Sequence, residues 1–144
     1  MIALYKKALM RFKHSAYTIA RKRLNSLKRC RDLDSQVFSD KYELIYGKFI
    51  SQFFFDTLCL RLTDGANYQR RASCLELILF ILKERFVDDK DLLQYFSRKI
   101  GNNLMNMLND SHESIVKMAA VVITMIPAGC FEQYMASVIV VICI

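Results

Sequence analysis

The chain has 144 residues, of which 53% are hydrophobic, and its formal net charge is +7. This length suits one domain with a sizeable core, and a single proline with only four glycines favours long helices over a turn-rich sheet. The composition argues against a zinc site or a disulfide scaffold, because two histidines accompany five widely spaced cysteines, Cys30, Cys59, Cys74, Cys130 and Cys143. We therefore expect a reducing compartment, the cytoplasm.

The first predicted helix covers residues 3–31 and is strongly basic. Residues 1–31 contain ten lysines and arginines and no acid, whereas the other 113 residues have a net charge of −3. Leu4, Ala8, Phe12 and Ile19 give it a broken apolar stripe. Its candidate contacts with RNA or another partner are Lys6, Lys7, Arg11, Lys13, Arg21, Lys22 and Arg23.

Three interpretations of this basic segment remain open. Lysine and arginine can displace counterions from the phosphates of RNA or of an anionic membrane surface. An acid-free, arginine-rich start is also typical of a mitochondrial transit peptide, although serines are few and no cleavage point is evident. The third interpretation is a solvated face of a packed helix.

A polar break at residues 32–40 precedes a second predicted helix at 41–62. Residues 63–65 then form a stop, and Asn67 is a suitable N-cap for a third helix at 68–86. Its inward face is predicted to comprise Ala72, Leu75, Leu79, Leu82 and Phe86, with Ile78 and Ile81 broadening the stripe.

The fourth predicted helix spans residues 90–109 and is weakened around Gly101 and its two following asparagines. Asp110 and Ser111 then cap a fifth helix at 112–126, which Pro127 ends. A sixth helix from residue 131 to the end is a further expectation. Each uncharged apolar run is too short to cross a bilayer, since a spanning helix needs about 20 apolar residues.

The predicted fold class is all-α, with five to six helices in an α-α superhelix of armadillo-like or HEAT-like helical repeats. A helix with a broad apolar face cannot bury that face alone, so neighbouring helix pairs must cover it. We expect a basic N-terminal helix and polar break at 1–38, a helical repeat core at 39–127 and an uncertain truncated apolar helix at 128–144. The apolar ending suggests a piece of a longer solenoid.

No residue pattern predicts an enzyme, a cofactor or a metal centre. His112 and Glu113 lie at the start of a helix without a second ligand or a nucleophile nearby. Arg70 and Arg71 follow a tight turn and are candidate contacts with phosphate or an acidic partner. The alternative for this pair is solvated guanidinium groups whose stems shield apolar surface.

The segment from residue 62 to residue 127 carries a resemblance. Its residues 64–71, Asp-Gly-Ala-Asn-Tyr-Gln-Arg-Arg, then Leu75, Leu77 and Leu79, and later Leu-Asn-Asp-Ser at 108–111 before Ala119 and Ala120, are similar to the thyroid adenoma-associated protein family. That family comprises large α-solenoids. It includes the non-catalytic subunit that works with a methyltransferase modifying ribose 2′-hydroxyls in the tRNA anticodon loop.

The resemblance implies a fragment of a regulatory scaffold for tRNA methylation, with a separate methyltransferase subunit and tRNA as partners. The alternative is a generic HEAT or armadillo adaptor that binds another protein along its groove without RNA contact. A membrane-associated helical protein is a third and weaker interpretation.

Overall fold

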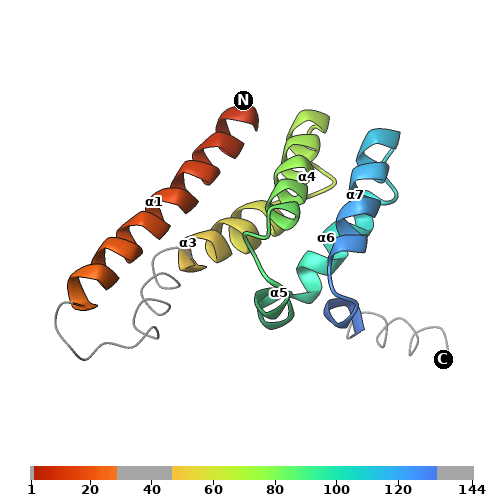
Figure 1. Cartoon of the computed structure of the whole chain (residues 1–144). Coiled ribbons are helices and arrows are strands. Elements are labelled where there is room, and N and C mark those ends of the chain that lie inside the picture. Colours follow the sequence, from red (N-terminus) through yellow and green to blue (C-terminus); the bar gives the residue numbers. More distant parts are fainter. Residues whose placement is uncertain (1, 29–46, 133–144) are drawn as a thin grey trace. The chain divides into compact units, whose positions relative to one another are not determined.

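The computed structural model describes residues 2–28 and 47–132, and every element in these ranges is a helix (Figure 1). The all-α prediction is therefore confirmed for this part of the chain. The chain divides into two compact units, Met1–Ile50 and Ser51–Ile144. The expected boundary after residue 38 and the polar break at 32–40 lie outside the described residues. The helices are α1 (Ile2–Lys28), α3 (Lys48–Ser51), η2 (Gln52–Cys59), α4 (Tyr68–Lys83), α5 (Asp89–Tyr95), α6 (Arg98–Met107) and α7 (Glu113–Met125).

In the first unit, α1 is one long helix whose buried side chains differ from the predicted stripe. Among the side chains of α1 that the structure describes, Leu9 and Ala16 are buried. They are seven residues apart and therefore lie on one side of a helix with 3.6 residues per turn. The rings of Phe12 and Phe49 lie 4.7 Å apart, which ties α1 to the end of the same unit. Leu4, expected in the apolar stripe, is 71% exposed instead.

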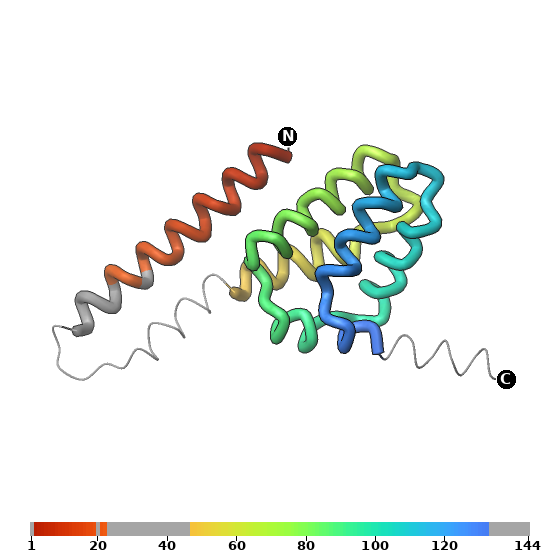
Figure 2. The backbone as a smooth tube through the Cα atoms, turned by 45° about the vertical axis from the view of Figure 1, so that its right-hand side comes forward, coloured from red at the N-terminus to blue at the C-terminus, as the bar shows by residue number. Residues whose placement is uncertain are grey.

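The second unit contains two helical hairpins stacked on each other. The first hairpin is η2 with α4, and the second is α6 with α7. α4 packs on α7 while η2 packs on α6, and α4 and α7 run in the same direction (Figures 1 and 2). The first helix of one hairpin therefore contacts the first helix of the other, and the second contacts the second. One layer consists of η2 and α6, and the other consists of α4 and α7.

Small and branched apolar side chains form much of the core of this unit. Ile78 of α4, Leu104 of α6, and Ile115, Ala119 and Val122 of α7 are fully buried. The three positions of α7 recur at spacings of four and three residues, which place them on one side of the helix. Burial of this surface is the main source of stability for the stack.

The residues after position 47 form two helix types where the sequence predicts one helix. The single α-helical turn of α3 is followed by the π-helix η2. At its end the amide of Leu60 donates to the carbonyl of Phe55, five residues back, at 3.0 Å. The wider winding directs Phe54 and Phe55 inward together, and their rings meet edge to face at 5.0 Å. Residues 41–46 of the predicted helix lie outside the described part.

The inward face of α4 matches the predicted one at most positions and differs at Ala72 and Leu79. Leu75 and Ile78 are fully buried, but Ala72 and Leu79 are only half-buried. Arg71, expected at the surface, is buried with them. α4 also ends at Lys83, three residues before the predicted end. The predicted N-cap Asn67 is confirmed, since its side chain accepts from the amide of Arg70 at 2.9 Å.

The predicted helix at 90–109 is wrong, because it is broken into α5 and α6. The break lies at Phe96–Ser97 rather than at Gly101, and Ser97 caps α6 by accepting from the amide of Ile100 at 3.3 Å. Gly101 is buried, and a Cβ atom there would lie 3.4 Å from the ring of Phe96. α6 continues through Gly101, so the glycine does not interrupt the helix.

α7 agrees with the predicted fifth helix to within one residue at each end. Residues 129–132 are helical again, and the remainder of the predicted sixth helix lies outside the described residues. No helix within 2–28 or 47–132 is long and apolar enough to cross a membrane.

Candidate nucleic-acid and partner interface

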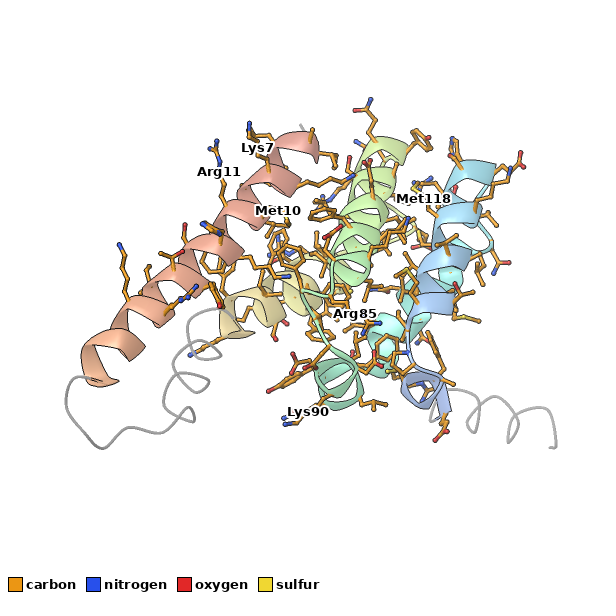
Figure 3. The ribbon with its side chains drawn as sticks, viewed as in Figure 1. Lys7, Met10, Arg11, Arg85, Lys90 and Met118 are labelled. Carbon is orange, nitrogen blue, oxygen red and sulfur yellow. The ribbon has the colours of Figure 1, made fainter. Side chains whose placement is uncertain are left out.

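The most regular charged feature of the described structure is a row of bases along α1. Lys7, Arg11, His14 and Arg21 are exposed, and their spacings of four, three and seven residues place them on one side of the helix. This side is opposite Leu9 and Ala16, the buried positions. We call these four residues the basic row. In Figure 3 the side chains of Lys7 and Arg11 project from the same side of α1.

The basic row extends about 21 Å along the helix axis, at 1.5 Å per residue from Lys7 to Arg21. Because residues 1–31 contain no acid, no carboxylate within α1 offsets its positive potential. Cationic groups spaced along a line fit a phosphate backbone, whose charges also follow one another in a line. The geometry therefore suits a polyanion better than a single small anion.

The other predicted bases of α1 differ in their exposure. Lys22 is exposed, whereas Lys6 and Lys13 are half-buried. Arg23 belongs to the helix, and its side chain lies outside the described part. Of the predicted set on α1, Lys7, Arg11 and Arg21 belong to the basic row, and Lys22 is exposed outside it.

Arg70 and Arg71, predicted as a pair, have different environments. Arg70 is exposed in the first turn of α4. Arg71 is only 8% exposed, and its Nε lies 2.7 Å from Oδ2 of Asp110. Its Nη2 donates to the other carboxylate oxygen at 3.2 Å, and its Nη1 donates to the carbonyl of Ala66. The interpretations of Arg71 as a surface contact and as a solvated cation are both wrong, because its guanidinium joins the two hairpins.

The closest atoms of the Arg71–Asp110 ion pair, Nε and Oδ2, attract each other as charges without forming a hydrogen bond. The Nε–Oδ2 distance is short, but the buried N–H is not directed at the oxygen as a hydrogen bond requires. The Nη2 bond supplies the directional part. The carboxylate also accepts from the amide of His112 at 2.9 Å, two residues further along the chain. His112 is the N-cap of α7 and makes no side-chain capping bond, so the predicted capping by Asp110 and Ser111 is wrong.

The hydrogen bond from the amide of His112 is the main reason that the pKa of Asp110 is lowered. The nearby side chains of His112 and Arg71 lower it further, against the opposing effect of burial. Asp110 is therefore ionised under neutral conditions. Its negative charge neutralises Arg71, so this buried pair offers no net charge to a ligand.

His112 completes this junction through its ring. Its Nδ1 lies 3.1 Å from Asp110 Oδ1, and its ring lies 4.6 Å from the ring of Tyr68. The hydroxyl of Tyr68 bonds the hydroxyl of Ser114 at 3.0 Å. We call Tyr68, Arg71, Asp110, His112 and Ser114 the α4–α7 junction; its contacts join residues of the two helices and their preceding turns.

Within the described residues, the chemistry for a metal or thiol site is limited. No three His, Cys, Asp or Glu side chains there are placed to hold a metal ion. Cys59, Cys74 and Cys130 are free thiols, and burial raises the pKa of each. Raised thiol pKa values favour the protonated form, which is a weak nucleophile.

Sequence reasoning missed two side chains that hold the stack together. The first is Asp110, which the sequence identified only as a helix cap. The second is Asn103, whose amide nitrogen donates to the carbonyls of Cys59 at 3.0 Å and Leu60 at 3.3 Å. Polar residues followed by an apolar helix signal a cap, but no local pattern signals a partner more than 38 residues away.

Comparison of the chain with family models, with curated proteins and with solved structures finds no significant match.

Proposed function

We propose that this protein is a non-catalytic helical scaffold that contacts RNA phosphates through the basic row of α1. The observation that carries the proposal is the alignment of Lys7, Arg11, His14 and Arg21 on one exposed side of a helix free of acids. Cations on one helix face attract phosphate and release its counterions whatever the base sequence.

The stacked hairpins support a scaffolding role in the second unit. Like-on-like packing of α4 on α7 and η2 on α6 is the unit from which helical solenoids are built. This packing supports the proposal that the unit belongs to the armadillo-like or HEAT-like class expected from the sequence.

The finer proposal concerns which RNA is bound and for what purpose. The resemblance of residues 62–127 to the thyroid adenoma-associated protein family suggests tRNA, held for ribose 2′-O-methylation by a separate methyltransferase subunit in the cytoplasm. In that role the scaffold would recognise shape and phosphates and would leave base reading to its partner.

The second candidate function is a protein–protein adaptor without RNA contact. Exposed apolar side chains flank the basic row of α1, and they include Leu4 at 71%, Tyr17 at 47% and Ile19 at 47%. Mixed apolar and cationic surfaces also bind acidic proteins. Both candidates are scaffolds, and they differ in the class of partner.

A charge-reversal experiment tests RNA contact. The full chain with Lys7→Glu, Arg11→Glu and Arg21→Glu should lose most of its affinity for tRNA. A matched control with Lys83→Glu, Lys90→Glu and Arg98→Glu changes the net charge equally at exposed positions of the second unit. This control should bind almost as the unaltered chain does. Equal losses in both variants would mean that only net charge matters, and the assignment to α1 would be wrong.

Copurification separates the two candidates. An affinity-tagged chain expressed in its native cells should recover tRNA together with a methyltransferase. Recovery of other proteins without RNA would favour the adaptor.

A further inference from the structure

A shallow groove lies beside the C-terminal end of α7, in the second unit and away from the α4–α7 junction. Its volume is about 750 Å³. The last turn of α7, the turn at residues 126–128 and the helical residues after it form the walls, and the first turn of α5 contributes Asp89. The lining residues are Asp89, Ile123, Thr124, Met125, Ile126, Pro127, Ala128, Phe131 and Glu132. We call it the α7 end groove.

Packing on α5 and α6 fixes one wall of this groove. The ring of Phe131 meets the ring of Phe96 edge to face at 5.1 Å. A Cβ atom at Gly129 would lie 3.0 Å from a methyl group of Leu93, so the backbone there approaches α5 closely. The amide of Phe131 donates to the carbonyl of Ala128 at 2.9 Å. The wall is therefore formed before any ligand binds, which lowers the entropy lost on binding.

The charged side chains that line the groove are both acidic. Asp89 and Glu132 are exposed carboxylates at its rim, and none of its nine lining residues is basic. The C-terminal end of α7 adds backbone carbonyls and the negative end of the helix dipole. A smaller neighbouring depression of about 370 Å³ shares Asp89 but contains Lys83 and Arg85, so it has mixed charge.

The apolar lining of the groove limits which ligands can bind there. Ile123, Met125, Pro127 and Phe131 offer aliphatic and aromatic surface between the two carboxylates. Anions are disfavoured by the rim, and a simple metal cation would not use the apolar surface. A side chain with a long apolar stem and a cationic end matches both features, since lysine and arginine bury their stems while the charged group stays at the rim.

We propose that the α7 end groove binds a peptide segment of a partner protein in which arginine or lysine lies beside apolar residues. The apolar side chains of that segment would cover Ile123 and Phe131, and its cationic groups would reach Asp89 and Glu132. The groove consists of other residues than the basic row of α1. It would select a cationic partner, whereas the basic row would select an anionic one. It adds a protein-binding site to the scaffold and does not depend on RNA binding.

The test uses the full chain and two synthetic helical peptides with the same leucine and alanine stripe. One peptide carries arginines beside the stripe, and the other carries glutamates at the same positions. Only the arginine peptide should bind, and amide resonances of Ile123 and Phe131 should shift on binding. Asp89→Asn combined with Glu132→Gln should weaken binding about tenfold, the effect of losing two rim ion pairs.

The matched control is Asp56→Asn combined with Asp64→Asn, which removes the same charge from two other exposed positions of the second unit. This control should bind the arginine peptide as the unaltered chain does. Circular dichroism checks that both double variants remain folded.

Three outcomes would overturn the proposal. The glutamate peptide could bind as tightly as the arginine peptide, or the rim variant could bind like the control variant. The groove could also prove to be covered by a second copy of the chain or by its own residues 133–144. In that case neither peptide would shift the resonances of Ile123 and Phe131. RNA binding should be the same in the rim variant, so failure here is distinguishable from failure of the proposed function.

Discussion

Arg71 of α4 and Asp110 of the turn before α7 form a buried ion pair, with 2.7 Å between Nε and Oδ2, that joins the two stacked hairpins. Their side chains are 10% and 5% exposed. Desolvation makes such a pair costly to form and still more costly to break, because the remaining charge has no partner. We therefore expect the pair to specify how the hairpins align more than it adds net stability.

Replacing either partner of this pair should destabilise the second unit. We expect Arg71→Gln or Asp110→Asn to lower the free energy of unfolding by roughly 2–4 kcal/mol, because a buried charge is left unpaired. Urea denaturation of the single and double variants measures the coupling. Arg70→Gln, at the exposed neighbouring position, is the control and should change stability by less than about 0.5 kcal/mol. A coupling energy near zero would show that the two residues do not act together.

The same carboxylate gives a pH dependence with a defined sign. The pKa of Asp110 is lowered in the folded chain, first by the amide of His112 and then by side-chain interactions with His112 and Arg71. Ionised Asp110 therefore contributes fully to the free energy of unfolding above its unfolded pKa of about 3.9. This contribution is lost as the pH falls through the lower pKa of the folded chain.

Urea denaturation at several acidic pH values tests this linkage. The stability difference between the unaltered chain and Asp110→Asn should shrink as the pH falls below about 4. A difference that stayed constant over this range would mean that Asp110 is not ionised in the folded state.

Asn103 should be important for the end of the π-helix. Its amide donates to the carbonyls of Cys59 and Leu60, which lie at the end of η2. Asn103→Ala should lower the free energy of unfolding by about 1–3 kcal/mol, since buried carbonyls lose a donor. Asn103→Asp is the sharper test, because it places an acceptor against acceptors and should cost at least as much. Thermal unfolding of both variants measures the effect, and an Asp variant as stable as the unaltered chain would contradict it.

Arg85 has a backbone conformation that favours glycine. Its φ is +51°, and the amides of Arg85 and Phe86 donate to the carbonyls of Leu82 and Ile81, the pattern of a Schellman motif after α4. Arg85→Gly should raise the free energy of unfolding by about 0.5–1 kcal/mol through relief of the left-handed strain. Arg85→Ala keeps the strain and is the control for loss of the side chain. A glycine variant less stable than the alanine variant would show that the strain is not significant.

Local patterns predicted most of the helices in the described part of the chain. Asn67 before α4 and Pro127 after α7 mark helix limits because capping and the missing proline amide act within one turn. The sequence did not predict the break at Phe96–Ser97, since the apolar spacing continues across it. It also did not predict the change of winding into η2, which places Phe54 and Phe55 inward together.

The candidate interface was predicted in part. A run of bases without acids indicates a cationic helix, and the structure places Lys7, Arg11 and Arg21 on its exposed side. The sequence could not separate Arg70 from Arg71, because burial of one arginine depends on Asp110, 39 residues further on. Such a partner is a property of the stacked hairpins and not of either segment alone.

The salt dependence of tRNA binding tests the central claim most directly. For the full chain, log affinity should fall linearly with log salt concentration, and each phosphate contact should contribute about −0.7 to −0.9 to the slope. Reversing Lys7, Arg11 and Arg21 to glutamate should make the slope less steep by about 2. A slope near zero for the unaltered chain, or the same slope for both proteins, would contradict RNA contact through the basic row of α1.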